Sequence, residues 1–85
     1  MPIRFTTSRL LKKLENLGIS HELYSLGEQM DDSLCLLPLP TGEWETFIGE
    51  RGEKTDRRVW PDEEAACFGF LGRLAWTQWQ TAVPA

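Results

Sequence analysis

Side chains that could carry out chemistry are few in this chain and far apart in the sequence. His21 is the only histidine, and no serine, cysteine or aspartate lies at a spacing from it that is typical of a nucleophile and its base. Cys35 and Cys67 each lie in an apolar stretch without a neighbouring metal ligand, which favours buried free thiols over a disulfide. We therefore expect no enzymatic activity, no metal and no cofactor, and we interpret His21 as an exposed or hydrogen-bonded strand residue.

The distribution of charge indicates what kind of partner the chain could bind. The formal net charge is −4 and the isoelectric point is about 4.9. Residues 1–18 carry four basic residues and one acidic residue, whereas residues 19–66 carry twelve acidic residues and four basic ones. An acidic middle disfavours a nucleic-acid partner and favours a basic protein surface, although acidic residues also serve simply to keep a protein in solution.

Length and apolar content set limits on the fold and on the location of the protein. At 85 residues with 41% hydrophobic residues, we expect one domain over 1–85 with a frayed tail at 81–85. The N-terminal segment lacks the apolar core of a signal peptide, and no apolar run reaches the ~18 residues of a membrane span. We therefore expect a cytoplasmic protein that makes no contact with a membrane.

The spacing of leucines predicts a helix near the N-terminus. Thr6 or Thr7 is a suitable N-cap and Gly18 a suitable end, and one helix face is formed by Leu10, Leu11, Leu14 and Leu17. Residues 19–26 then predict a first strand, because β-branched and aromatic residues recur there. The polar residues 27–33 predict a loop that places acidic side chains at one end of the sheet.

The stretch from Leu34 to Arg51 predicts a β-hairpin around the turn Pro40-Thr41-Gly42, and the rest of the fold is arranged around it. Residues 49–56 are charged and contain two glycines, which predicts either a flexible turn or a protruding contact loop. A further short strand is expected at 57–60. The middle of the chain is therefore expected to form most of a small sheet.

A second helix is predicted to begin at Pro61, where three acidic residues follow and complement the helix dipole. Gly69 and Gly72 within it indicate a close contact with a neighbouring element. Trp76 and Trp79 are expected either in the core or in a contact with a partner or a second copy. The chain is thus expected to be α+β: a small antiparallel sheet of three to four strands with an N-terminal and a C-terminal helix packed on it, in the order α-β-β-β-(β)-α.

Short motifs over roughly residues 22–74 resemble the small cytoplasmic immunity proteins of bacterial polymorphic toxin systems. The segments that carry this resemblance are Tyr24-Ser25-Leu26-Gly27, Asp32-Ser33-Leu34-Cys35-Leu36, Gly42-Glu43-Trp44-Glu45, Glu50-Arg51-Gly52-Glu53-Lys54 and Glu63-Glu64-Ala65-Ala66-Cys67. The resemblance implies an inhibitor without catalysis of its own. Such an inhibitor binds the cognate toxin domain of a larger effector protein, commonly by covering its active site.

A tight complex needs an aromatic or arginine anchor at its centre, with charged residues that speed association. If both helices cover one face of the sheet, the other face presents part of the hairpin, including Trp44 or Phe47. We therefore predict a partner-binding surface that consists of Tyr24, Glu28, Glu43, Trp44, Glu45, Glu50, Arg51, Glu53 and Asp56. The alternatives for these residues are that Tyr24 and Trp44 are core residues, that Glu50 and Arg51 pair with each other, and that the remaining acids are only solvated. The alternative for the whole chain is a self-associating structural or adaptor module that forms a homodimer.

Overall fold

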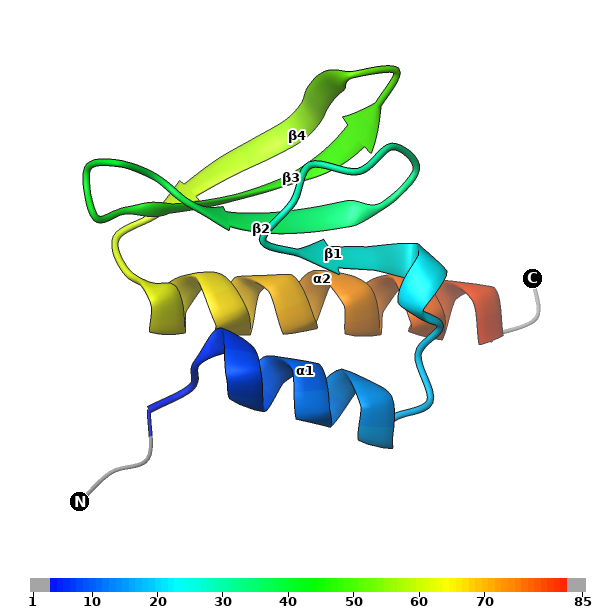
Figure 1. Ribbon diagram of the computed structural model, residues 1–85. Helices are drawn as coiled ribbons and strands as arrows, with labels where there is room; N and C mark the ends of the chain where they lie inside the picture. The colour runs from blue at the N-terminus through cyan, green and yellow to red at the C-terminus, as the bar shows by residue number, and fades with distance from the viewer. Residues whose placement is uncertain (1–3, 83–85) are drawn as a thin grey trace.

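The computed structural model describes the backbone of residues 4–82 and the side chains of residues 4–76, in which two helices and a four-stranded sheet form an α+β fold (Figure 1). The elements in chain order are α1 (Thr7–Asn16), the 3₁₀ turn η1 (His21–Leu23), β1 (Tyr24–Leu26), β2 (Leu34–Pro38), β3 (Trp44–Glu50), β4 (Glu53–Trp60) and α2 (Glu63–Ala82). This order confirms the predicted fold class. Of the expected frayed tail, residues 81 and 82 belong to α2, and 83–85 lie outside the described residues.

The sheet has the strand order β1-β2-β3-β4 and is mixed. The pairs β2/β3 and β3/β4 are antiparallel as expected, but β1 runs parallel to β2. The first strand is also shorter than predicted, because Ser20 caps η1 with its hydroxyl group and turns residues 21–23 away from extended structure. The loop 27–33 then crosses the sheet instead of reversing the chain beside it, and this path makes the pair parallel.

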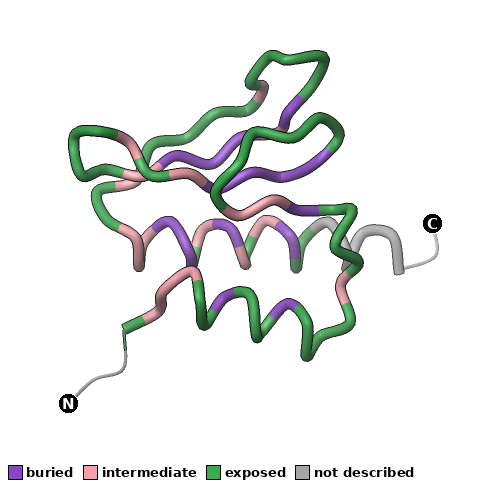
Figure 2. The backbone as a smooth tube through the Cα atoms, viewed as in Figure 1, coloured by how far each residue is buried: buried purple, intermediate pink, exposed green. Residues whose placement is uncertain are grey.

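Both helices lie on one side of the sheet, and the core lies between them and the strands (Figures 1 and 2). The central core residues are Leu10, Leu14, Tyr24, Leu34, Leu36, Ala66, Cys67, Phe70 and Leu74. Trp44 and Trp60 are partner residues on neighbouring strands and pack against this cluster from the helix side of the sheet. The expectation that Trp44 is presented on the open face is therefore wrong, because its strand position directs it toward the helices.

Helix α1 begins and ends where the sequence predicts. The hydroxyl group of Thr6 accepts a hydrogen bond from the amide of Arg9, and Gly18 follows the helix with φ +73°, a conformation that glycine adopts without steric cost. The buried stripe of α1 is narrower than expected, because only one row of its leucines packs against the rest of the molecule. Leu10 and Leu14 are fully buried, whereas Leu11 and Leu17 are exposed.

The segment expected to be a flexible loop at 49–56 is instead a tight hairpin. Strands β3 and β4 are joined by Arg51 and Gly52, which both have positive φ angles, as in a type I′ turn. Arginine is unusual at that position, so the turn was hard to recognise from sequence. The pairing continues through Glu53 and places residues 53–56 in a strand rather than in a loop.

The acidic residues before and within the first turn of α2 bind backbone amides of two different elements. Asp62 accepts from the amide of Ala65 within the same turn, at 2.8 Å. Glu63 accepts from the amide and hydroxyl groups of Thr7, and Glu64 accepts from the amide of Phe5, at 2.9 Å. The expected capping role is therefore accompanied by a second role, in which α2 holds the start of α1.

The remaining expectations for α2 have separate outcomes. Gly69 lies directly against the ring of Trp60, which confirms the predicted close contact, whereas a Cβ added at Gly72 would have no described atom of another element within 4 Å. The side chain of Trp79 lies outside the described residues.

Cys35 and Cys67 are buried free thiols, as predicted. Burial, together with the nearby charges of Glu63 and Glu64, raises the pKa of Cys67 to about 11.

Candidate interaction surface

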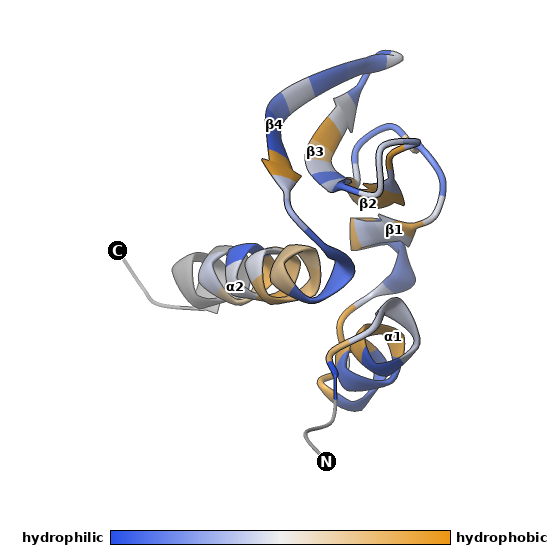
Figure 3. Ribbon diagram, turned by 90° about the vertical axis from the view of Figure 1, so that its left-hand side faces the viewer, coloured by the Kyte–Doolittle hydropathy of each residue, from blue (hydrophilic) through white to orange (hydrophobic). Residues whose placement is uncertain are grey.

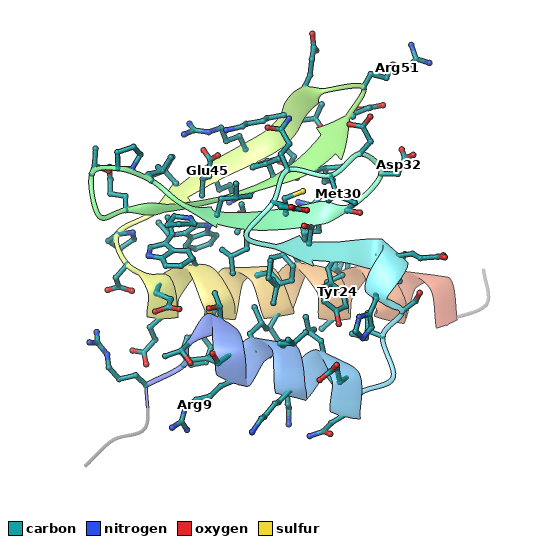
Figure 4. The ribbon with its side chains drawn as sticks, viewed as in Figure 1. Arg9, Tyr24, Met30, Asp32, Glu45 and Arg51 are labelled. Carbon is teal, nitrogen blue, oxygen red and sulfur yellow. The ribbon has the colours of Figure 1, made fainter. Side chains whose placement is uncertain are left out.

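The face of the sheet opposite the helices carries a buried carboxylate held by two cations. Glu45 is only 2% exposed, and its two oxygens receive hydrogen bonds from Lys54 and from the guanidinium group of Arg57, the latter at 2.7 Å (Figure 4). Lys54 also lies 4.8 Å from the centre of the Phe47 ring. Two basic residues three positions apart would ordinarily point to opposite faces of a strand. An irregularity in β4 is needed to bring both to Glu45.

A β-bulge supplies that irregularity. The register shifts by one residue between the pairs Thr46/Arg58 and Ile48/Thr55, and Asp56 in the shifted segment has φ +51°. The extra residue returns Arg57 to the face on which Lys54 and Glu45 lie. The side chain of Asp56 instead points toward α2, where it forms an ion pair with Arg73. This interaction lowers the pKa of Asp56.

Opposing effects act on the pKa of Glu45. Burial alone raises it, but the hydrogen bonds and charges of Lys54 and Arg57 outweigh burial, so that the pKa lies below the ordinary value. The carboxylate is therefore ionised and fully engaged within the chain. Glu45 was predicted to face a partner, but its position makes it a structural residue whose two cations are the exposed members of the cluster, with side chains 36% and 44% exposed.

The two predicted aromatic anchors belong to the interior. Tyr24 is 7% exposed, and its hydroxyl group is buried without a hydrogen-bond partner among the described residues. Burial, with a smaller contribution from Glu15, raises its pKa. Trp44 is half-buried against the core, and Phe47 is completely buried. The alternative that Tyr24 and Trp44 are core residues is therefore the one the structure favours.

A second cluster lies at the end of the sheet where the loop 27–33 meets the β3–β4 turn. The amide of Gly52 donates to Oδ1 of Asp31 at 2.9 Å, and the side-chain amide of Gln29 donates to the carbonyl of Gly52 at 3.0 Å. The amide of Asp32 donates to the carbonyl of Gly49 at 2.8 Å. These hydrogen bonds join the loop 27–33 and the β3–β4 turn, which are distant in sequence, into one surface.

We call this surface the acidic end; it consists of Asp31, Asp32, Glu50, Arg51 and Glu53. All five residues are exposed, and Figure 4 shows Asp32 and Arg51 projecting from the same region of the molecule. Glu50 and Glu53 are direct cross-strand partners, an arrangement of like charges that is destabilising. Among the described residues, neither of these two, nor Asp32, forms an ion pair with a basic side chain.

The structure thus brings together some of the predicted residues and separates others. Glu50, Arg51 and Glu53 lie in the acidic end, and Asp31 and Asp32 join them although the prediction left them out. Their position before β2 is the signal that could have included them. Glu28 lies earlier in the same loop, where its carbonyl accepts from the hydroxyl group of Ser25. Glu43 lies in the β2–β3 turn, where it accepts from Thr41.

His21 lies on the surface, in the turn that precedes β1. It lies in η1 rather than in a strand, its side chain is 69% exposed, and Nε2 is 3.5 Å from a carboxylate oxygen of Glu15. No group of three or more metal-ligating side chains occurs among the residues with described side chains. None of the helices within the described range has the length and apolar content to cross a membrane.

No protein-family model, curated protein or solved structure matches this chain.

Proposed function

We propose that this chain binds and neutralises a cognate bacterial toxin domain, with the acidic end directed at a basic surface of that domain. The observation that carries the proposal is a set of exposed acids, on two hydrogen-bonded loops, that form no ion pair with a described basic side chain. Hydrogen bonds hold the two connections together, and the facing pair Glu50 and Glu53 costs folding stability. A basic partner surface would relieve that cost on binding.

Arg51 is the proposed anchor of this surface. It lies at the tip of the turn with φ +54°, a strained conformation for a residue with a side chain, and its side chain is exposed between Glu50 and Glu53. A guanidinium group in that position can form two parallel hydrogen bonds to a carboxylate of the partner. The surrounding acids then contribute mainly to the association rate and to specificity.

The first test is a pull-down of the tagged protein from its native host, with mass spectrometry and calorimetric titration of what co-purifies. A one-to-one complex with the C-terminal domain of a larger effector is the expected result. Recovery of the chain alone, as a dimer or larger assembly, would contradict the proposal and favour the self-associating module.

Charge variants then locate the interface. The double substitution Glu50→Gln/Glu53→Gln is expected to lower the association rate with the toxin domain by about tenfold at low salt and by much less at high salt, because screening removes long-range attraction. The control is Glu15→Gln/Glu22→Gln, which removes the same charge from exposed residues outside the acidic end. Equal effects of the two double variants would show that only net charge matters.

A further inference from the structure

Over residues 65–72, helix α2 lacks the polar outer face that a helix packed on one side of a sheet ordinarily has. Between Glu64 and Arg73 its residues are Ala, Ala, Cys, Phe, Gly, Phe, Leu and Gly, without a single charged side chain. Ala66, Cys67 and Phe70 face the core, yet Phe68 is 61% exposed. A helix segment that is apolar on all sides is typical of one that is covered on all sides. In Figure 3 the sheet lies above both helices, and no other described element lies below them.

The outer side of the helix pair is hollowed into a groove, which we call the α1–α2 groove. One part is an open, shallow hollow of about 420 Å³ lined by Arg4, Phe5, Arg9, Lys13, Phe68 and Leu71. A second hollow of about 260 Å³ is lined by Leu17, Gly18, Ile19, Leu71 and Ala75, and Leu71 joins the two. The ring of Phe5 packs edge-on against that of Phe68, with 4.9 Å between centroids, and forms part of the floor.

The charged side chains that line the groove are all cationic. Arg4, Arg9 and Lys13 line it and form no ion pair with a described residue. The nearest acids in the sequence of α2, Glu63 and Glu64, accept hydrogen bonds from backbone amides of residues 5 and 7. The groove therefore combines an apolar floor with a cationic rim.

We infer that the α1–α2 groove binds an acidic amphipathic helix of a partner protein. A concave apolar channel between two helices suits a third helix that inserts residues at i, i+3 or i+4, and i+7, while acidic side chains on its flanks meet the cationic rim. The ten residues of α1 span about 15 Å, so roughly three turns of the bound helix would make contact. This inference is independent of the toxin-binding proposal, which uses the opposite charge at another surface.

Two other occupants fit the groove less well. A symmetric dimer through this groove would place the same patch of both copies face to face and bring the cationic rims together. An anionic membrane would match the charge, but a lipid surface does not fill a hollow between helices as a helix does. Both remain outcomes of the test.

The test is fluorescence anisotropy of a labelled designed peptide, added to the full chain at low salt. The probe has about 14 residues, with leucine at the helical spacing and glutamate on both flanks; its control carries lysine in place of each glutamate. We expect the acidic peptide to bind at least about tenfold more tightly than the basic one, through the rim charges. Failure of the acidic peptide to bind at up to about 1 mM, or equal binding of both peptides, would overturn the inference.

Neighbouring residues of α1 supply a matched pair of variants. Lys13 lines the groove and Lys12 does not, although both are exposed. Lys13→Glu is expected to weaken binding of the acidic peptide by about fivefold, Lys12→Glu by less than about twofold, and Phe68→Ala by about tenfold. Equal effects of the two lysine variants would overturn the assignment. So would binding to phosphatidylserine vesicles in place of the peptide, or a dimer in sedimentation that Phe68→Ala dissociates.

Discussion

At the scale of single residues, Glu45 is an acid that the sequence places at the surface but that the fold buries and uses to hold two strands together. Polar and apolar residues alternate only partially around Glu45, and a charged residue in such a strand is expected at the surface. The partners that bury it, Lys54 and Arg57, come from the next strand and reach it only through the bulge at Asp56. Because Lys54 and Arg57 are partly exposed, water can solvate them if Glu45 is removed, which limits the cost.

Glu45→Gln is expected to lower the free energy of unfolding by about 1–3 kcal/mol, because it replaces charged hydrogen bonds with weaker ones in a buried position. Urea denaturation followed by tryptophan fluorescence measures this. Glu43→Gln, an exposed residue two positions earlier, is the control and should change stability by less than about 0.5 kcal/mol. A loss of the same size in both variants would argue against a special role for Glu45.

The pH dependence of stability gives a second view of Glu45. Its folded-state pKa lies below the ordinary value of 4.5, so its contribution is complete above that value and disappears as the pH falls through the lower, folded-state pKa. The difference in unfolding free energy between wild type and Glu45→Gln should therefore be constant at neutral pH and shrink on acidification below about pH 4.5. A difference that stayed constant to pH 2 would contradict the ion cluster.

At the scale of elements, local chemistry and the hairpin pairing of β2 with β3 could be predicted, whereas the pairing of β1 and the bulge in β4 could not. The ends of α1 and the start of α2 follow from capping residues, because a cap acts within one helical turn. The parallel β1/β2 pair and the bulge depend on which strands meet, and no local pattern specifies that. The acidic end was only half predicted for the same reason, since it joins residues 31–32 to the distant turn at 51–52.

The two glycines of α2 make a prediction about packing between elements. An alanine side chain at Gly69 would overlap the ring of Trp60, whereas one at Gly72 would meet no described atom of another element within 4 Å. Gly69→Ala should destabilise the fold by about 1–3 kcal/mol, and Gly72→Ala should stabilise it by about 0.5–1 kcal/mol through helix propensity. Thermal unfolding of both variants decides the point. The same sign of change in both would contradict the contact between α2 and β4.

At the scale of the whole molecule, opposite charges are concentrated in different places. The cations of α1 rim the groove beneath the helices, and the acidic end lies where the β3–β4 turn meets the loop 27–33. Figure 4 shows Arg9 on the outer side of α1, far from Asp32 and Arg51. A net charge of −4 conceals this separation. The two proposed binding surfaces can therefore select partners of opposite charge without competing for the same residues.

The attachment of α1 to the rest of the molecule also belongs to this scale. Glu63→Ala/Glu64→Ala removes the acceptors of the amides of Phe5 and Thr7 and should lower the free energy of unfolding by about 1–2 kcal/mol. Hydrogen exchange of those two amides should accelerate more than exchange in the sheet. The control is Glu22→Ala/Glu28→Ala, which removes two exposed acids elsewhere. Unchanged exchange at Phe5 and Thr7 would show that the two glutamates do not hold α1.

The same two glutamates link the beginning of the chain to residues made much later. On the ribosome, α1 emerges before α2 and lacks both its hydrogen-bond acceptors and its apolar partners until α2 has followed. The leucines of α1 and the inner faces of β2 and β3 therefore stay uncovered until α2 emerges, at risk of association with other nascent chains. Completion of α2, rather than formation of the hairpin, is the event that ends this exposure.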